Sequence, residues 1–209
     1  MKTIYLLRHG EIPTHSPRRF VGQMDLALTE RGREQMRWTA GCLKDTGIDS
    51  LVTSPLGRCR EIAGILGEVL GLSPELEPAL REIALGAWEG MTVAEVRQRF
   101  PGSYEARGKD IAIFRPPAGE SFTDLSDRVW PAFLRILQGP AENIAIVGHA
   151  GVNRILLCRL LGMPLSLLFR LRQDFACINI IRWRDGDFEL ELLNGSPAML
   201  DPLLWHRPV

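Results

Sequence analysis

The sequence lacks any apolar run of the length that a membrane helix needs, which is about 20 residues. Its first apolar stretch, residues 4–7, ends at Arg8. That is too short for the h-region of a secretory signal, which has roughly 7–15 apolar residues. We therefore expect a cytoplasmic protein that has no membrane partner.

The chain also has no excess charge and no clustered cysteines. Its 25 Lys and Arg residues are balanced by 25 Asp and Glu residues, so the formal net charge is zero. This balance argues against a dedicated nucleic-acid-binding protein, although it permits a local basic pocket for a small anion. Cys42, Cys59, Cys158 and Cys177 are far apart and form no CxxC pair. We expect reduced thiols and no metal cluster built from them.

The apolar pattern alternates between strand and helix periods along the chain. Strand patterns occupy residues 2–7, 50–53, 76–80 and 142–147. Helix patterns occupy residues 30–44, 56–70, 92–100, 122–137 and 152–161. Two further strand patterns, 176–184 and 188–193, flank an Asp-Gly-Asp turn and predict a hairpin. The order predicts the α/β class: a three-layer α/β/α sandwich with a mostly parallel central sheet, an antiparallel edge strand and one domain over residues 1–209.

Two histidines lie where predicted strands end. His9 follows the first strand and His149 follows the strand at 142–147. In open α/β folds, ligands bind at the carboxyl edge of the sheet, where such residues meet. Arg8 and Arg58 can fork onto phosphate oxygens, and Glu82 in a loop-like stretch can supply a proton. A neutral imidazole can act as a nucleophile near pH 7, so these residues predict a phosphate site.

Several short motifs occur in a specific order, and together they indicate a family. They are Leu7-Arg8-His9-Gly10-Glu11, Gly22-Gln23 with Leu28-Thr29-Glu30-Arg31-Gly32, Ser54-Pro55-Leu56-Gly57-Arg58, Arg81-Glu82 with Gly86-Ala87-Trp88-Glu89-Gly90, Pro117-Ala118-Gly119-Glu120-Ser121, and Val147-Gly148-His149-Ala150-Gly151. In these segments the chain resembles the histidine phosphatase superfamily, in its phosphoglycerate mutase-like branch.

The resemblance implies a role for each matching residue. His9 becomes the nucleophile that is transiently phosphorylated. Arg8, Arg58 and His149 form the phosphate pocket, and His149 also counts among the catalytic residues. Glu82 becomes the general acid and then the base that activates water. The resemblance implies no metal and no cofactor.

The chain departs from the family pattern just after the first motif. The family usually has Thr or Ser, and then Asn, at the positions that hold Ile12 and His15 here. That Asn helps to hold the phosphate, so either His15 replaces it as a donor or the loop is rearranged. Gln23 stands where family members touch substrate. We therefore regard His15 and Gln23 as possible substrate-binding residues.

A few other residues have both a functional and a structural interpretation. Arg18 and Arg19 fit a solvated loop pair better than an anion-recruiting pair. Lys109 and Arg115 lie in the segment that would cover the pocket. Trp88 fits core packing better than a stacking platform.

The resemblance leaves the reaction open between hydrolysis and phosphoryl return to a sugar acid. Mutases of this family carry a longer, more basic insertion between the third and fourth motifs, whereas the corresponding segment here, residues 92–117, is short. We therefore favour a phosphatase of a small phosphorylated metabolite, with alpha-ribazole 5'-phosphate as a candidate substrate. A cofactor-dependent phosphoglycerate mutase is one alternative, and an inactive protein-binding scaffold is another. A homodimer through the edge of the terminal hairpin also stays open.

Overall fold

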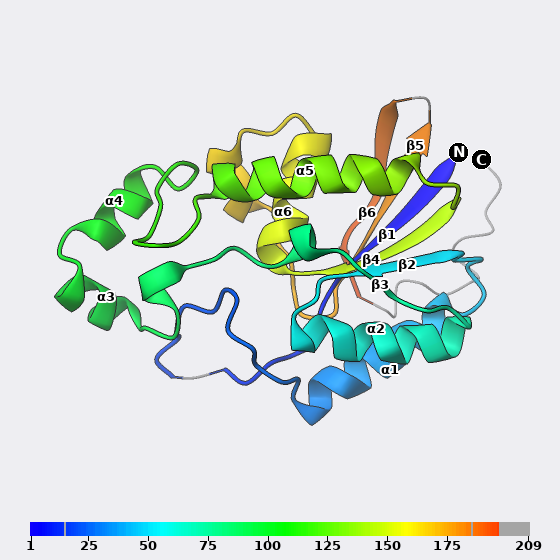
Figure 1. The fold of residues 1–209 in the computed structure, drawn as a ribbon, viewed down its shortest axis with the longest axis horizontal. Helices are drawn as coiled ribbons and strands as arrows, with labels where there is room; N and C mark the ends of the chain where they lie inside the picture. The colour runs from blue at the N-terminus through cyan, green and yellow to red at the C-terminus, as the bar shows by residue number, and fades with distance from the viewer. Residues whose placement is uncertain (15, 185, 197–209) are drawn as a thin grey trace.

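The computed structural model describes residues 1–14, 16–184 and 186–196 and is built around one sheet of six strands (Figure 1). Across the sheet the strands lie in the order β3-β2-β4-β1-β5-β6. Their bounds are β1 (Lys2–Arg8), β2 (Ser50–Thr53), β3 (Glu75–Leu76), β4 (Asn143–Gly148), β5 (Ile178–Arg184) and β6 (Asp187–Gly195).

The first four strands in this order run parallel, and the direction changes on the far side of β1. There β5 pairs antiparallel with β1, and β6 pairs antiparallel with β5. The sheet is therefore mostly parallel with antiparallel pairing at one side, which confirms the predicted fold class. The strand that runs against all others is β5, one place in from the edge.

Helices cover both faces of the sheet (Figure 1). Two of them, α1 (Glu30–Leu43) and α2 (Gly57–Leu70), pack together on one face. On the other face α5 (Phe122–Gln138) packs on α6 (Ala150–Leu160). The remaining helical elements are α3 (Val93–Arg99), α4 (Ser103–Lys109) and the 3-10 turns η1 (Pro78–Leu80), η2 (Gly86–Trp88) and η3 (Leu165–Arg170).

The central strands supply a separate core to each face because side chains alternate along a strand. In β1, Ile4 and Leu6 join the core under α5 and α6, whereas Tyr5 and Leu7 join the core under α1 and α2. The neighbouring strand β4 divides its side chains in the same way. A strand that is buried on both faces has to be continuously apolar, and that is how the sequence of β1 reads.

Helix ends follow the signals in the sequence. The Thr29 side chain accepts a hydrogen bond from the Gly32 backbone and caps α1. Thr92 and Ser121 begin α3 and α5 with reciprocal capping boxes. Gly71 ends α2 at a φ of 68°, a left-handed conformation that glycine adopts without steric cost.

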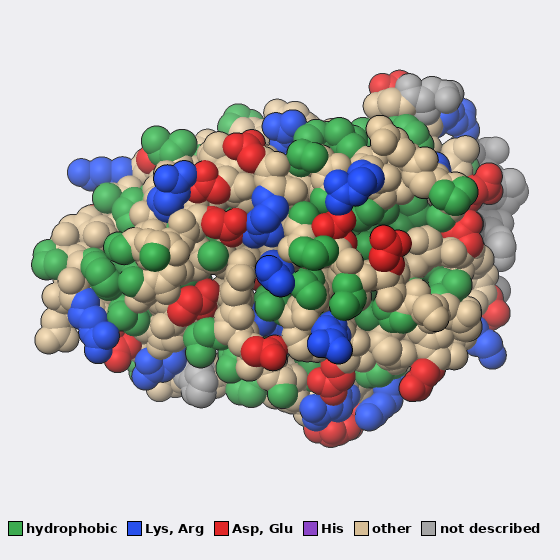
Figure 2. All heavy atoms as spheres, viewed as in Figure 1, with side chains coloured by type: hydrophobic (Ala, Val, Ile, Leu, Met, Phe, Trp, Pro, Cys, Tyr) green, Lys and Arg blue, Asp and Glu red, His purple; other side chains and the backbone are tan. Residues whose placement is uncertain are grey.

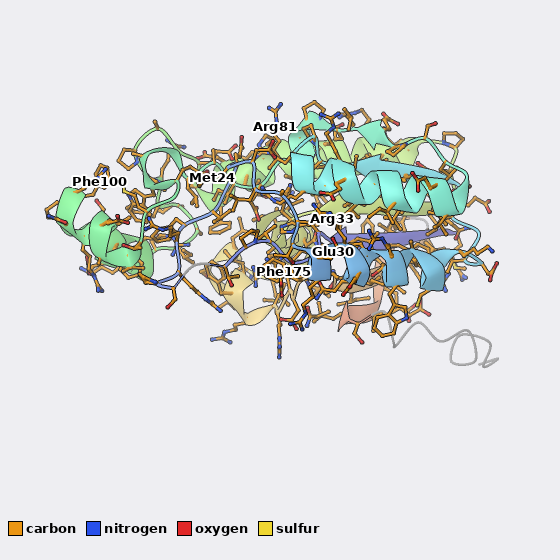
Figure 3. The ribbon with its side chains drawn as sticks, turned by 90° about the horizontal axis from the view of Figure 1, so that it is seen from below. Met24, Glu30, Arg33, Arg81, Phe100 and Phe175 are labelled. Atoms are coloured by element: carbon orange, nitrogen blue, oxygen red, sulfur yellow. The ribbon has the colours of Figure 1, made fainter. Side chains whose placement is uncertain are left out.

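Two local predictions need correction. The predicted strand at 76–80 is wrong beyond Leu76, because Pro78 has no N–H to continue the ladder and begins η1 instead. The sequence analysis also did not include α4, which forms after the Gly102 backbone turns at a φ of 78°. Together α3 and α4 extend away from the sheet, and Phe100 between them lies at the far tip (Figure 3).

An aromatic cluster joins this helical extension to the body of the molecule. The buried Trp88 ring lies 5.1 Å from the Phe20 ring and 5.3 Å from the Phe114 ring, between centroids. A backbone bridge between Arg19 and Thr92 fixes the segment after β1 to the start of α3. Trp88 is therefore a core residue, as predicted.

Three of the four cysteines are buried, and side chains of both charge signs share the surface. Cys59, Cys158 and Cys177 are buried free thiols, whereas Cys42 is only partly buried. Positive and negative side chains are intermixed over the face in Figure 2. Among the described residues, no helix has the length and apolar character to cross a membrane.

Candidate active site

The two strand-end histidines lie together at the carboxyl edge of the sheet. Since β1 and β4 are parallel neighbours with Arg8 opposite Gly148, the next residue of each strand is a histidine at the same edge. The ring centroids of His9 and His149 are 5.3 Å apart. Two segments separated by about 140 positions in the sequence therefore meet at one edge of the sheet, as the strand-end positions of the two histidines predicted.

A cavity of about 580 Å³ opens at this edge. Its inner wall includes five side chains or backbone groups of the motifs: Arg8, His9, Arg58, Glu82 and Gly151. Its outer wall includes Phe20 from the segment after β1, Arg107 from α4, Arg154 from α6 and Phe169 from η3. Phe175, from the segment before β5, lines the inner end beside Arg8 and His9. The cavity thus lies between the sheet edge and the helical extension.

The hydrogen bond of His9 selects its tautomer. Nδ1 of His9 lies 2.8 Å from the carbonyl oxygen of Gly10, which can only accept, so Nδ1 carries the proton. Nε2 then holds the free lone pair, and it makes no hydrogen bond within the described part of the chain. Burial, with the charges of Arg8 and Arg58, lowers the pKa of His9 well below its usual range. The imidazole is therefore neutral near pH 7, the form in which Nε2 is nucleophilic.

Arg58 is 1% exposed and held by three hydrogen bonds. Its Nη1 and Nη2 donate to the carbonyls of Met24 and Gly22, each at 2.7 Å, and its Nε donates to Nδ1 of His149 at 3.2 Å. The side chain comes from the first turn of α2, directly after the Ser54-Pro55 turn. Each terminal nitrogen of a guanidinium carries two protons, so N–H groups remain to bind an anion in the cavity.

Arg8 is held differently. Its Nη1 donates to the carbonyl of Gln173 at 2.7 Å, and its guanidinium carbon lies 4.0 Å from the centre of the Phe175 ring. Phe175 packs against the buried core under α1 and α2. The Nε atom of Arg8 is buried and has no partner in the described structure. Burial lowers the pKa of Arg8 from its usual value.

Glu82 is fixed by two backbone donors. Oε1 accepts from the Ile83 N–H at 2.9 Å, and Oε2 accepts from the Gly151 N–H at 3.0 Å. A Cβ atom at position 151 would lie 2.3 Å from Oε1 of Glu82, so the carboxylate can approach the start of α6 only over a glycine. The Gly151 in the last motif is therefore a steric requirement for placing Glu82.

His149 lies behind the cavity wall, fully buried. Its Nδ1 accepts from Arg58, so its Nε2 carries the proton and lies 2.8 Å from the Ser54 hydroxyl. Burial and the Arg58 charge lower its pKa well below the usual range. The Cys59 thiol lies 3.5 Å from Nε2 of His149. Burial raises the pKa of Cys59 to about 12, so Cys59 is a neutral thiol and not a thiolate. With both ring nitrogens occupied, His149 orients Arg58 in this structure.

The weaker candidates lie in less direct positions. The Gln23 side chain donates to the Glu82 carbonyl at 2.9 Å and so supports the backbone of the acid. His15 lies outside the described residues. Arg19 lines the cavity but pairs with Glu95, and Arg115 pairs with Asp124. The first pairing is consistent with a structural role for Arg19.

Several residues of the cavity wall lie outside the sequence motifs. Arg107, Arg154, Phe169 and Phe175 line the cavity but belong to none of the motifs. One signal was available for Arg154, because it lies three residues after Gly151 on the same helix and hence on the same face. The other three reach the cavity through tertiary packing that a single sequence does not reveal.

Within the described ranges, no group of three or more His, Cys, Asp or Glu side chains is arranged to bind a metal ion. The positive charge around the inner cavity comes instead from Arg8, Arg58 and the start of α6.

The chain matches one known protein family over most of its length. Residues 4–196 match the family described as the histidine phosphatase superfamily, branch 1. The chain is 34% identical over 196 residues to a bifunctional protein of Mycobacterium tuberculosis, covering 92% of this chain but only 54% of that one. The chain thus spans about half the length of that relative.

Two solved structures have the same fold. The alpha-ribazole phosphatase from Shigella flexneri is 30% identical with a TM-score of 0.86, covering 92% of this chain and 96% of that one. A mycobacterial glucosyl-3-phosphoglycerate phosphatase, in complex with VO3, is 29% identical with a TM-score of 0.83, covering 94% and 100%. The two are similar to this chain to nearly the same degree, although their names state different substrates.

Proposed function

Since the chain belongs to branch 1 of the histidine phosphatase superfamily, we propose that it is a phosphatase that hydrolyses a small phosphomonoester through a phosphohistidine formed at His9. The observation that carries this proposal is the tautomer of His9. With the Nδ1 proton bound to the Gly10 carbonyl, the Nε2 lone pair is the reactive position in a cavity whose inner wall also holds the guanidinium groups of Arg8 and Arg58 and the carboxyl group of Glu82.

In the first step, Nε2 of His9 attacks phosphorus, the N–P bond forms and the ester P–O bond breaks. Glu82 gives its proton to the departing alkoxide oxygen, so the leaving group departs as a neutral alcohol. Arg8, with its unpartnered Nε, and Arg58 bind the phosphoryl oxygens. The first backbone N–H groups of α6 add to this positive environment.

In the second step, water replaces the alcohol. The Glu82 carboxylate takes a proton from the water, the new O–P bond forms, and the N–P bond breaks to return neutral His9 and free phosphate. The backbone bonds of Glu82 keep the carboxyl group in one place for both proton transfers. His149, proposed from the sequence as a catalytic and phosphate-binding residue, supports this pocket by orienting Arg58. A direct phosphate contact would require one of its present hydrogen bonds to be exchanged.

Several further features remain predictions. They are the single domain over residues 1–209, the cytoplasmic location, a homodimer, and substrate contacts of His15 and Gln23. Alpha-ribazole 5'-phosphate stays a candidate substrate, and the name of the Shigella flexneri relative supports it. The name of the mycobacterial relative supports a phosphoglycerate derivative equally well.

The test is phosphate release from a panel of phosphomonoesters, with and without EDTA. The panel contains alpha-ribazole 5'-phosphate, phosphoglycerates, sugar phosphates and an aryl phosphate. We expect release that EDTA does not reduce, since arginines supply the charge around the phosphoryl group. Interconversion of phosphoglycerates without release would favour the mutase. No reaction with any member would contradict the proposal and favour the scaffold.

A further inference from the structure

Two half-buried arginines on the outer wall of the cavity have no acidic partner. Arg107 comes from α4 and Arg154 from α6, and neither forms a salt bridge in the part of the chain that the structure describes. Other arginines of the same region do: Arg97 pairs with Glu105, and Arg115 pairs with Asp124. Arg107 and Arg154 therefore carry charge that no neighbouring carboxylate neutralises by direct contact.

Both guanidinium groups lie against the same aromatic ring. The guanidinium carbon of Arg107 is 5.7 Å from the centre of the Phe169 ring, and that of Arg154 is 5.3 Å from it. Phe169 is 53% exposed and packs edge-on against Phe122. Cation–π contact holds each arginine near the ring, but it also brings two like charges to one place. Burial lowers the pKa of both arginines, in line with charge that is only partly solvated.

The hydrogen bonding leaves these groups free to bind a ligand. Nε of Arg154 donates to the Leu171 carbonyl at 2.8 Å, which fixes the side chain but leaves its terminal nitrogens available. The two carboxylates that act on Arg154 through space are already engaged. Glu82 accepts two backbone N–H groups, and Asp174 pairs with Arg172.

The position of Arg154 relates this cluster to the leaving group. Arg154 lies three residues after Gly151, the residue whose N–H contacts Glu82, so it lies one helical turn further along the same face. In the proposed reaction Glu82 protonates the leaving oxygen. An alcohol that extends from Glu82 along this face of α6 reaches Arg154 and Phe169, which line the same cavity.

We propose that Arg107, Arg154 and Phe169 form a subsite for a second anionic group, a carboxylate or a second phosphate, on the alcohol part of the substrate. Guanidinium groups bind both anions through paired N–H donors. The proposal rests on the proposed phosphatase function and names its substrate class. It favours phosphorylated organic acids or bisphosphates over phosphate esters of neutral alcohols.

The experiment compares substrates that differ in the second anion. One pair is 3-phosphoglycerate and glycerol 3-phosphate, in which a hydroxymethyl group replaces the carboxylate. The other pair is fructose 1,6-bisphosphate and fructose 6-phosphate. In at least one pair, we expect the wild-type kcat/KM to be at least about 10-fold higher for the compound that carries the second anionic group. A charge-assisted hydrogen bond contributes about that factor to affinity.

Three variants test whether the subsite causes the preference for a second anionic group. Arg107→Gln and Arg154→Gln are expected to reduce it about 10-fold each, while kcat/KM for the singly phosphorylated neutral alcohol stays within about threefold. Arg97→Gln, a neighbouring arginine outside the cavity, serves as the control and keeps the preference. The Arg107 side chain forms no hydrogen bond in the described structure, so its variant tests the idea even if Arg154→Gln fails to fold.

Calorimetry separates this proposal from the phosphatase function. The same four compounds are titrated into the wild type and into His9→Ala, which cannot turn them over by the proposed route. Tighter binding of the compounds with a second anion, lost in Arg107→Gln, supports the subsite even if no substrate is hydrolysed. Equal kcat/KM and equal affinity within both pairs, or an undiminished preference in both glutamine variants, would overturn it.

Discussion

The arginines of the inner and outer cavity differ in how they are held. At the inner end, Arg58 donates to three protein groups and Arg8 is bound by a carbonyl and an aromatic ring. At the outer end, Arg107 and Arg154 rest on Phe169 with few hydrogen bonds and no salt bridge among the described residues. In the proposed reaction, the inner end is preorganised for the phosphoryl group that every phosphomonoester shares, and the outer end meets the part of the substrate that varies.

The largest effect should come from removing the nucleophile. We expect His9→Ala to lower kcat by at least about 10⁴-fold, because the proposed chemistry has no replacement for Nε2. The measurement is phosphate release under saturating substrate, with the far-UV circular dichroism spectrum as a check on folding. Turnover within tenfold of wild type would show that the inner cavity works by another route.

Removing the proton donor should give a smaller loss that depends on the leaving group. For Glu82→Gln we expect kcat/KM to fall about 10²–10⁴-fold with alkyl phosphates and much less with an activated aryl phosphate, whose phenolate leaves without a proton. Glu105→Gln, on the surface of α4, is the matched control. Equal losses for both substrate types would show that Glu82 is not the acid.

Stability should separate the inner from the outer arginines. Arg58→Ala leaves two carbonyls and one imidazole nitrogen without their donor in a buried place, and each such loss costs about 1–3 kcal/mol. We expect its unfolding free energy in urea to fall by roughly 2–4 kcal/mol. Arg107→Ala should change it by less than about 1 kcal/mol. Similar losses in the two variants would remove the distinction between the two ends.

The buried histidines should make stability depend on pH near neutrality. Their pKa values are lowered in the folded protein, so below about pH 6.5 the unfolded chain binds protons that the folded chain does not. Stability is then complete above pH 6.5 and falls as the pH drops, by up to about 1.4 kcal/mol per pH unit for each histidine. Urea unfolding between pH 5.5 and 7.5 measures the slope, and His9→Gln should reduce it by about half. A slope that is unchanged in His9→Gln would mean that His9 is protonated in the folded state.

The sequence could predict the inner end of the cavity better than the outer end. His9 and His149 were found together because they end two apolar strands, and parallel strands place their ends at one edge. The short range of such signals also explains the errors. Pro78 ends a strand that its apolar neighbours suggested, and α4 has no long apolar face to reveal it. Arg107 and Phe169 reach the cavity only because α4 and η3 pack beside it, which depends on contacts between distant segments.

The central claim, that His9 carries the phosphoryl group, can be tested by trapping it. Glu82→Gln is mixed with an isotopically labelled aryl phosphate, which needs no acid to react but leaves the intermediate without a base to activate water. After a rapid quench at alkaline pH, peptide mapping by mass spectrometry locates the label. The account predicts a stoichiometric phosphoryl group on Nε2 of His9. A burst of product with the label on another residue, or with no labelled protein, would contradict it.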